Sequence, residues 1–285
     1  MSNPLVSICI PTYNGEKFIT QAMQSAINQS YHPLEIIVSD DESFDSTLDI
    51  VNLFIAKTNI PIKIINHKSS SIGSNWNSCV AHSNGDYIKF LFQDDLLKNN
   101  CIEEMVKLAV SDNEIGLVFS KRNFITEGNS DYFKEWVHQY GDLQSNWTEI
   151  QTIQSGKKLL KDINFLSSPK NKVAEPSSVL LAKFVFKKVG YFNTDLKQSL
   201  DYEFWYRVFK FYKIGYINHE LSTFRLHEQQ TTIKNKSVVI SDYQDYPKFV
   251  YDNLFWQLHP KIKTKLFLKY NFIVRVIRKI ISFFN

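Results

Sequence analysis

The fold is decided by one stretch of sequence, Tyr87-Ile88-Lys89-Phe90-Leu91-Phe92-Gln93-Asp94-Asp95, in which an apolar run ends in two adjacent carboxylates. The apolar run predicts a buried strand, so both acids should lie at the rim of a sheet. Paired carboxylates at such a rim suit Mg²⁺ or Mn²⁺ that carries the phosphates of a substrate. A plain turn before the next helix explains Asp94 and Asp95 equally well, because aspartate is common in turns and helix caps.

Outward from this stretch, the first 120 residues alternate between short apolar runs and segments with apolar residues at helical spacing. This alternation predicts an α/β fold with a doubly wound, Rossmann-like and mostly parallel sheet. The predicted strands are Val6–Ile10, Leu34–Ser39, Ile62–Asn66, Tyr87–Phe92 and Gly116–Ser120. The predicted helices are Glu16–Asn28, Ser46–Lys57, Ser74–Ala81 and Asn100–Val110. Ligands of such sheets bind beyond the carboxyl ends of the strands, so we expect the site there.

The second part of the chain is less regular. Residues 121–172 are predicted to be loops with one helix, Ser155–Lys161. Regular structure then resumes, and its predicted elements are a strand at Ser178–Leu181, a helix ending at Val189, a helix at Leu200–Phe211 and a short strand at Ile214–Ile217.

Composition limits the function classes. The chain has 285 residues, 44% of them hydrophobic, which indicates a globular protein. Its three cysteines, Cys9, Cys79 and Cys101, lack the spacing of a zinc site or a disulfide framework and indicate a reducing compartment. No signal peptide or apolar run of about 20 residues is recognisable, so we expect a cytoplasmic protein. We expect no nucleic acid partner.

Polar and aromatic side chains follow the first three predicted strands. Pro11-Thr12-Tyr13-Asn14-Gly15 presents a ring that can stack on a base or sugar, although a plain turn also fits. Asp40-Asp41-Glu42 can accept hydrogen bonds from a nucleobase or ribose, while Asp45 or Ser46 can cap the next helix. Asn75-Trp76-Asn77 offers amides and an indole, although Trp76 also suits a core position. Together with the acid pair, these groups suit a nucleotide that carries a diphosphate and a metal.

These segments resemble the family-2 glycosyltransferases of GT-A fold in order and spacing, from about Leu5 to Arg225. The resemblance is carried first by Val6–Gly15 (VSICIPTYNG), Asn28–Tyr31 (NQSY), Glu35–Ser43 (EIIVSDDES) and Gly85–Asp95 (GDYIKFLFQDD). It continues in Glu175–Ser178 (EPSS), Val189–Phe192 (VGYF), Leu200–Arg207 (LDYEFWYR) and Phe224–His227 (FRLH). It implies a GT-A domain over residues 1–230, with a nucleotide-sugar-binding half at 1–120 and an acceptor half at 121–230, followed by a helical appendage at 231–285.

The resemblance also implies roles for single residues. Asp95 would bind a diphosphate-bound Mn²⁺ or Mg²⁺, with His227 near it, and Asp201 would be the catalytic base. The expected nucleotide-sugar-binding residues are Pro11, Tyr13, Asn14, Asp41, Asn75, Trp76, Asp94 and Arg225.

Simpler explanations exist for three of these residues. Asp201 can be a helix N-terminal charge that interacts with the helix dipole. Arg225 can hold a structural ion pair, and His227 can be an ordinary surface histidine.

Two departures from the family pattern put contacts in doubt. Asn75-Trp76-Asn77 stands where many relatives carry an arginine near the pyrophosphate, and Phe92 stands where many have a further aspartate. The metal site is therefore expected to contain fewer acidic side chains than is usual in the family.

The resemblance implies an inverting, metal-dependent glycosyltransferase of bacterial surface polysaccharide assembly. The expected donor is a nucleotide sugar, UDP-linked, and the expected acceptor is a hydroxyl of a glycan or a lipid-linked saccharide. A nucleotidyltransferase that makes the nucleotide sugar is an alternative, but it would need a basic Gly-rich loop that Pro11–Gly15 does not supply. A non-catalytic binding module is another, and the joint presence of Asp41, Asp95 and Asp201 argues against it.

The last 25 residues are basic and amphipathic. Although the net charge of the chain is only +4, this segment contains no acid, and its cations are Lys261, Lys263, Lys265, Lys269, Arg275, Arg278 and Lys279. On a single helix one apolar face would hold Ile262, Leu266, Tyr270, Ile273, Ile277, Ile280 and Phe284. Such a helix would lie on an anionic membrane, the inner face of the plasma membrane, or pack on the domain or a partner subunit.

Overall fold

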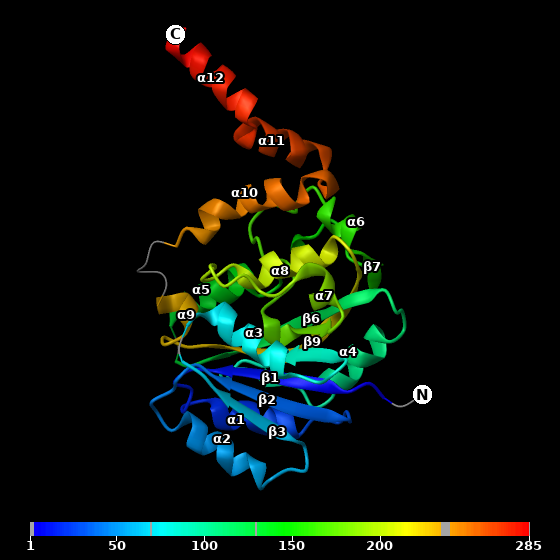
Figure 1. Cartoon of the computed structure of the whole chain (residues 1–285), viewed down its shortest axis with the longest axis vertical. Coiled ribbons are helices and arrows are strands. Elements are labelled where there is room, and N and C mark those ends of the chain that lie inside the picture. Colours follow the sequence, from blue (N-terminus) through cyan, green and yellow to red (C-terminus); the bar gives the residue numbers. More distant parts are fainter. Residues whose placement is uncertain (1–2, 69, 129, 235–239, 285) are drawn as a thin grey trace.

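The computed structural model describes residues 3–68, 70–128, 130–234 and 240–284 (Figure 1). A nine-stranded sheet crosses the molecule in the order β3-β2-β1-β4-β8-β6-β9-β5, and β7 pairs with β9. Helices cover both faces of the sheet, and the C-terminal helices lead away from it. The longest strand pairings, β1 with β2 and β6 with β9, are parallel. The predicted α/β fold with a helical C-terminal part is therefore confirmed.

Four parallel strands form one half of the sheet. They are β1 (Val6–Thr12), β2 (Leu34–Asp40), β3 (Ile62–Asn66) and β4 (Tyr87–Phe90). Their near-continuous apolar residues require cover on both faces. One face is covered by α1 (Ile19–Ile27), α2 (Thr47–Ile55) and α4 (Cys101–Ala109), and the other by α3 (Ile72–His82). Every predicted element of this half forms, with ends shifted by a few residues.

The other half of the sheet is mixed. The strand β8 (Val179–Ala182) lies antiparallel between β4 and β6 and so joins the two halves. Next to it, β6 (Ile115–Thr126) and β9 (Lys213–Leu226) pair in parallel along almost their full lengths. The short strands β5 (Leu96–Leu97) and β7 (Ile153–Ser155) pair with β9.

The predicted lengths of two of these strands are wrong. Short strands were expected at Gly116–Ser120 and Ile214–Ile217, but β6 and β9 continue well beyond both ranges. The extra residues of β6 include Lys121 and Arg122, whose polar side chains hide the strand pattern. Backbone pairing between the two strands supplies the stability that apolar alternation does not indicate.

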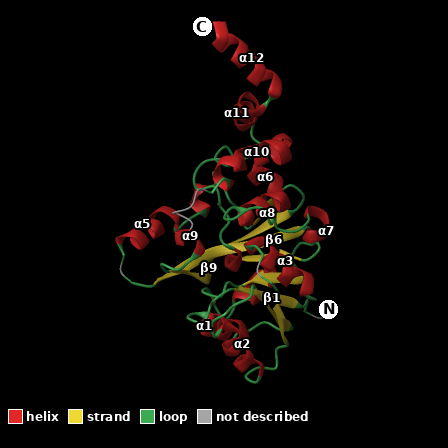
Figure 2. Ribbon diagram, turned by 60° about the vertical axis from the view of Figure 1, so that its left-hand side comes forward, coloured by secondary structure: helices red, strands yellow, loops and turns green. Residues whose placement is uncertain are grey.

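The prediction for residues 121–172 is incomplete. The helix expected at Ser155–Lys161 is present as α6 (Gly156–Leu160), but α5 (Asp131–Tyr140) was not predicted. Only Phe133 of α5 is fully buried, so the helix lacks the apolar stripe of a core helix. Figure 2 shows α5 set apart from the main body, next to the far end of β9. Two predicted helices, α7 (Val185–Val189) and α8 (Leu200–Phe209), form as expected.

The C-terminal region is a series of helices. They are α9 (Thr231–Lys234), α10 (Asp242–Leu254), α11 (Pro260–Tyr270) and α12 (Phe272–Phe284). The expectation of one continuous amphipathic helix is wrong, because the backbone is extended at Asn271, between α11 and α12. Ile262 and Leu266 of α11 are buried in the main core, so this part of the tail packs on the domain.

In contrast, α12 exposes apolar side chains. Phe272 is 77% exposed and Ile273 is 66% exposed. The side chains of Arg278, Lys279 and Ile280, and that of Phe284, lie outside the described part of the structure. Within the described ranges, no helix combines the length and apolarity that crossing a bilayer requires. The three cysteines of the chain are buried and free.

Candidate active site

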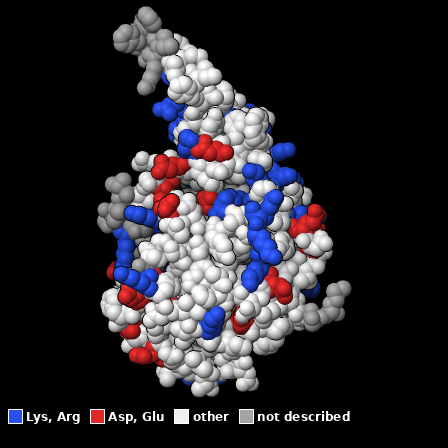
Figure 3. Space-filling view, in the orientation of Figure 1, with Lys and Arg blue, Asp and Glu red and all other residues white. Residues whose placement is uncertain are grey.

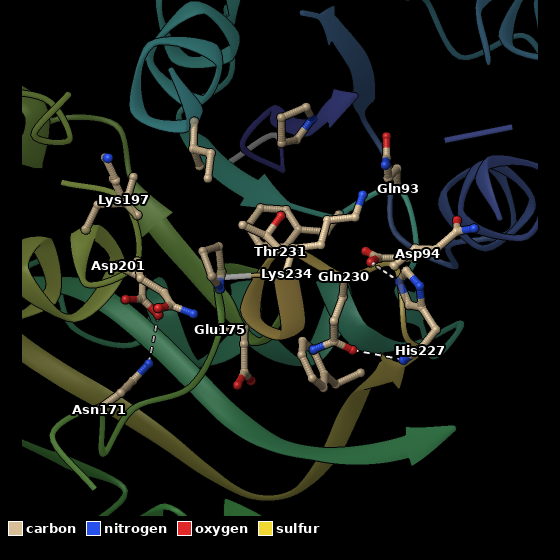
Figure 4. Close-up of a pocket in the computed structure, with 18 of the residues that line it drawn as sticks. Gln93, Asp94, Asn171, Glu175, Lys197, Asp201, His227, Gln230, Thr231 and Lys234 are labelled. Atoms are coloured by element: carbon tan, nitrogen blue, oxygen red, sulfur yellow. Dashed lines mark hydrogen bonds and ion pairs between the residues drawn. The ribbon is translucent and has the colours of Figure 1, made fainter. Parts of the chain in front are cut away.

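A cavity of about 1030 Å³ lies beyond the carboxyl ends of β1, β2 and β4 (Figure 4). Residues from both halves of the chain line it, including α5 and the start of α8. The predicted site residues that line it are Pro11, Tyr13, Asn14, Asp41, Asn75, Trp76, Asp94, Asp201 and His227. The other two, Asp95 and Arg225, lie behind its wall with 1% and 4% of their surface exposed. The structure thus brings most of the predicted residues together.

The loop after β1 is fixed by hydrogen bonds that leave the Tyr13 ring in the cavity. The Tyr13 amide donates to Gln93 Oε1 at 2.9 Å, and Gln93 Nε2 donates back to the Tyr13 carbonyl at 3.0 Å. Asn14 adopts a left-handed backbone with φ of 48°, a conformation that asparagine tolerates. The Tyr13 ring remains 50% exposed, with Phe44 edge-on at 6.5 Å between ring centroids.

Of the acids after β2, Asp41 is the one that faces the cavity. Asp40 is fully buried and accepts hydrogen bonds from Thr12 Oγ1 and Ser43 Oγ, each at 2.7 Å. Asp45 accepts the Thr47 amide at 3.0 Å, which is the capping role considered from the sequence. Asp40 and Asp45 are therefore structural carboxylates, and Glu42 does not line the cavity. Asp41 lines the cavity, and its Oδ1 also accepts the Ser70 amide at 3.2 Å.

The α3 residues combine structural contacts with a place on the cavity wall. Asn75 Nδ2 donates to the Thr12 carbonyl at 3.2 Å, which ties α3 to the end of β1. Trp76 is 7% exposed and packs against Phe92 at 5.1 Å and Phe192 at 5.2 Å between ring centroids. Trp76 is thus mainly a core residue, with one edge at the cavity.

The adjacent acids Asp94 and Asp95 point in different directions. Asp94 Oδ2 lies 2.9 Å from Nε2 of His227 at the cavity wall (Figure 4). Asp95 faces the protein interior, where it accepts hydrogen bonds from Ser177 Oγ at 2.6 Å and from the Arg225 amide at 3.1 Å. Burial, together with the charge of Asp94, raises the pKa of Asp95 well above its ordinary value. The strand end therefore presents one carboxylate to a ligand, not two.

Arg225 belongs to a structural network behind this wall. Its Nε donates to the Asp94 carbonyl at 2.9 Å, and its Nη1 lies 2.6 Å from Glu127 Oε1. The guanidinium also lies 4.6 Å from the centroid of the Phe18 ring. These contacts match the structural ion pair considered from the sequence, and they hold the backbone of Asp94 in place.

The donor set fits a metal that arrives with a diphosphate better than a resident one. Within the described ranges, no group of three or more histidine, cysteine, aspartate or glutamate side chains could hold a metal. Asp94 and His227 are two neighbouring candidate ligands, and Nδ1 of the buried His227 has no hydrogen-bond partner. Mg²⁺ commonly uses one or two protein carboxylates and takes its other ligands from phosphates and water.

Asp201 lies in the first turn of α8, across the cavity from Asp94 and His227 (Figure 4). Its Oδ2 accepts a hydrogen bond from Asn171 Nδ2 at 2.8 Å, whereas its buried Oδ1 has no partner. Burial, with a smaller contribution from the charge of Glu175, raises the pKa of Asp201 to about 7. A carboxylate that titrates near neutral pH is a suitable proton acceptor.

The sequence prediction missed the group that surrounds Asp201. Glu175 and Tyr140 both line the cavity, and both are held by the buried Arg122. Arg122 Nε lies 2.7 Å from Glu175 Oε2, and its Nη2 donates to the Tyr140 carbonyl at 2.9 Å. Glu175 lies in the segment Glu175–Ser178 that carries part of the family resemblance, but nothing in the sequence pattern links it to Arg122.

Residues 7–190 of the chain match the family described as Glycosyl transferase family 2. Among the curated relatives, an uncharacterized glycosyltransferase of Rickettsia typhi is 31% identical over 235 residues, which cover 81% of this chain and 66% of that protein. A chondroitin synthase of Escherichia coli is 38% identical over 128 residues, which cover 44% of this chain and 18% of that protein. The chain thus spans about two thirds or less of these relatives.

A solved structure has the same fold. Staphylococcus aureus TarS, residues 1–349, crystallised with UDP-GlcNAc, superimposes with a TM-score of 0.68 at 18% identity. The match covers 93% of this chain and 73% of that chain.

Proposed function

Because the chain belongs to glycosyl transferase family 2, we propose that it transfers a sugar from a nucleotide-sugar donor to an acceptor hydroxyl with inversion at the anomeric carbon. The single observation that carries this proposal is the shared cavity, which is lined both by the loops after β1 and β2 and by Asp201 of α8. Residues 1–120 would bind the donor, residues 121–230 the acceptor, and residues 231–285 would form the appendage.

The donor end of the cavity suits a nucleoside diphosphate. The exposed ring of Tyr13, with Pro11 beside it, can cover a base, while Asp41 can accept hydrogen bonds from base or ribose. Asn14 and Asn75 line the same end. A UDP-linked sugar is the proposed donor, in line with the UDP-GlcNAc bound to TarS.

The diphosphate would bind beside Asp94 and His227, and these two residues would hold its Mn²⁺ or Mg²⁺. When bound, the cation would stabilise the negative charge of the departing diphosphate as a Lewis acid. Asp95, the ligand that the family resemblance implies, would have to release Ser177 and the Arg225 amide before its carboxylate could reach that cation.

Asp201 is the proposed base. Its carboxylate would take the proton from the acceptor hydroxyl as that oxygen forms a bond to the anomeric carbon, and the unpartnered Oδ1 would have to become exposed to the cavity to do so. The bond from the anomeric carbon to the diphosphate oxygen breaks at the opposite face, which produces inversion. Asn171 holds the other oxygen of Asp201 and so fixes the orientation of the carboxylate.

The proposed setting is surface polysaccharide assembly at an anionic membrane, on a glycan or lipid-linked acceptor. Two observations support a membrane contact: α12 exposes Phe272, Ile273 and Ile277, and the same helix carries Arg275. Figure 3 shows a largely uncharged surface on the described part of α12, with Lys and Arg side chains around its base. Such a helix can lie in the interface of a bilayer with anionic lipids.

The membrane contact is tested by liposome flotation. The chain truncated after Asn271 should float with anionic vesicles far less than the full chain, and Ile273→Ser with Ile277→Ser should reproduce the loss. Equal flotation of the full and truncated chains would contradict the membrane contact, while donor turnover should be the same in both.

Donor turnover is tested with a panel of UDP-, GDP- and dTDP-linked sugars in Mn²⁺, Mg²⁺ or EDTA. We expect nucleotide release with a UDP-sugar, dependent on the divalent cation. Tight binding without any hydrolysis or transfer would favour a binding module. Consumption of a nucleoside triphosphate with a sugar phosphate would favour a nucleotidyltransferase.

A further inference from the structure

One face of α5 forms the wall of the cavity on the acceptor side. The α5 residues that line the cavity recur at helical spacing, and they are Tyr132, Glu135, Trp136, Gln139 and Tyr140. Phe133, which precedes Tyr140 by two helical turns and so lies at the edge of this face, is buried and anchors the helix. The helix therefore turns its aromatic and polar face toward the cavity and uses little of its surface for the core.

The aromatic part of this face is held rigidly. The Trp136 ring stacks on Phe224 at 5.5 Å between centroids with an interplanar angle of 18°, and Tyr140 lies 5.2 Å away. The guanidinium of Arg122 lies 5.0 Å from the Phe124 ring and 6.0 Å from the Trp136 ring. A ring that is fixed in this way loses little conformational entropy when a ligand stacks on it.

This wall is physically connected to Asp201. The backbone of Tyr140 is bonded to Arg122, which also contacts Glu175, the carboxylate whose charge acts on Asp201. Tyr243 lines the same cavity as Asp201 and Tyr140. A molecule whose hydroxyl reaches Asp201 would therefore have its body against the α5 face.

Polar groups alternate with the rings on this face. Glu135 and Gln139 are exposed side chains that line the cavity, and neither makes a hydrogen bond or ion pair within the described residues. Rings with hydrogen-bonding groups one helical turn apart suit a ligand with an apolar C–H face and a hydroxyl-bearing edge. A pyranose ring has both features.

We propose that the α5 face is an acceptor subsite that binds a pyranose ring of a saccharide, with Trp136 against the ring face and Glu135 and Gln139 at its hydroxyls. The proposal rests on the proposed glycosyltransferase function, and it names the acceptor class. A linear polyol phosphate has no flat face to place on Trp136. An alkyl chain has no groups that could hydrogen-bond to Glu135 and Gln139.

The test separates donor chemistry from acceptor binding. Donor hydrolysis by water, measured as nucleotide release without acceptor, reports the donor end. Saturation-transfer NMR with methyl pyranosides, disaccharides, ribitol phosphate and octanol, each added to the chain with UDP and Mn²⁺, reports the acceptor end. Trp136→Ala should reduce saccharide binding about tenfold or more, because it removes the stacking surface.

Matched variants exclude a folding artefact. Trp136→Phe should restore most of the binding, and Gln139→Ala, which removes no internal contact, should weaken binding severalfold. Trp256→Ala is the control, because this indole is 80% exposed and lies outside the cavity lining. Donor hydrolysis should stay within twofold of wild type in all four variants.

Each outcome decides one question. Pyranosides that bind the wild type and Trp136→Ala equally would overturn the subsite, as would binding of ribitol phosphate or octanol alone. Loss of donor hydrolysis in Trp136→Ala would assign the residue a structural role instead. Saccharide binding by a wild type that neither hydrolyses a donor nor transfers its sugar would leave the subsite standing and overturn the proposed transferase activity.

Discussion

The two ends of the cavity are built by different means. At the proposed donor end, Gln93 accepts a hydrogen bond from Tyr13 of the loop after β1, and Asp40 accepts one from Ser43 of the loop after β2. At the proposed acceptor end, aromatic rings on α5 and β9 stack on one another around Arg122. Hydrogen-bonded loops fix the positions of individual atoms, whereas stacked rings fix a surface. The hydrogen-bonded loops suit a ligand of fixed chemistry. The stacked rings suit a binding face that can change when single side chains are substituted.

The largest expected effect separates chemistry from donor binding. Asp201→Asn keeps the size of the side chain but removes the proton acceptor, so transfer should fall about 1000-fold. Donor affinity should remain within about twofold, because Asp201 lies away from the nucleotide loops. Initial transfer rates and isothermal titration with UDP measure the two quantities. If donor affinity fell as much as the transfer rate, Asp201 would not be the catalytic base.

A smaller effect should distinguish the adjacent acids. Asp94→Ala should lower Mn²⁺-dependent donor affinity about 100-fold, because it removes a carboxylate beside the diphosphate. Asp95→Ala should instead lower the free energy of unfolding by about 1–3 kcal/mol, because Ser177 and the Arg225 amide lose a buried acceptor. Titration in Mn²⁺ and in EDTA, with urea unfolding, measures both. Loss of affinity with unchanged stability in Asp95→Ala would make Asp95 the metal ligand.

The smallest expected effect is a pH dependence confined to the acceptor end. With a pKa of about 7, Asp201 is ionised above neutral pH, so transfer should rise about tenfold from pH 6 to pH 8 and then level off. UDP binding should change much less over this range. A flat transfer profile would mean that Asp201 does not accept the proton in the limiting step.

Asp201 should also make the stability of the fold depend on pH, and stability should fall as the transfer rate rises. The native pKa of Asp201 lies above its ordinary value of 3.8, so the native state holds a proton that the unfolded chain has lost between about pH 4 and pH 7. The stabilising contribution is present at low pH and is lost as pH rises through 7. Asp201→Asn should therefore raise the melting temperature by a few degrees at pH 8 and by less at pH 5.

The donor end could largely be predicted from the sequence. The carboxyl ends of parallel strands meet at one edge, so the order of strands and loops was enough to bring Tyr13, Asp41 and Asp94 together. The divergence of Asp94 and Asp95 could not be predicted, because it depends on Ser177 and Arg225, which are distant in the chain. The family resemblance implied Asp201 as the base, but its raised pKa depends on burial.

The acceptor end was harder to predict. The helix α5 contacts the core mainly through Phe133, so its pattern lacks the apolar stripe by which helices are recognised. Its lining residues do recur at helical spacing, from Tyr132 to Tyr140, and a search for aromatic and polar periodicity would have found them. Helix residues that face a ligand instead of the core recur at the helical period, but they are not the apolar residues by which that period is usually recognised.

The position of β8 has a consequence for substrate exchange. This strand is hydrogen-bonded to β4 on one side and to β6 on the other, so both ends of the cavity belong to one uninterrupted ladder. A clamshell opening would have to break that ladder, at a cost far above that of moving a loop. Donor loading and product departure should then proceed by rearrangement of side chains and short loops over a static platform. Structures with and without donor should superimpose closely across all the strands.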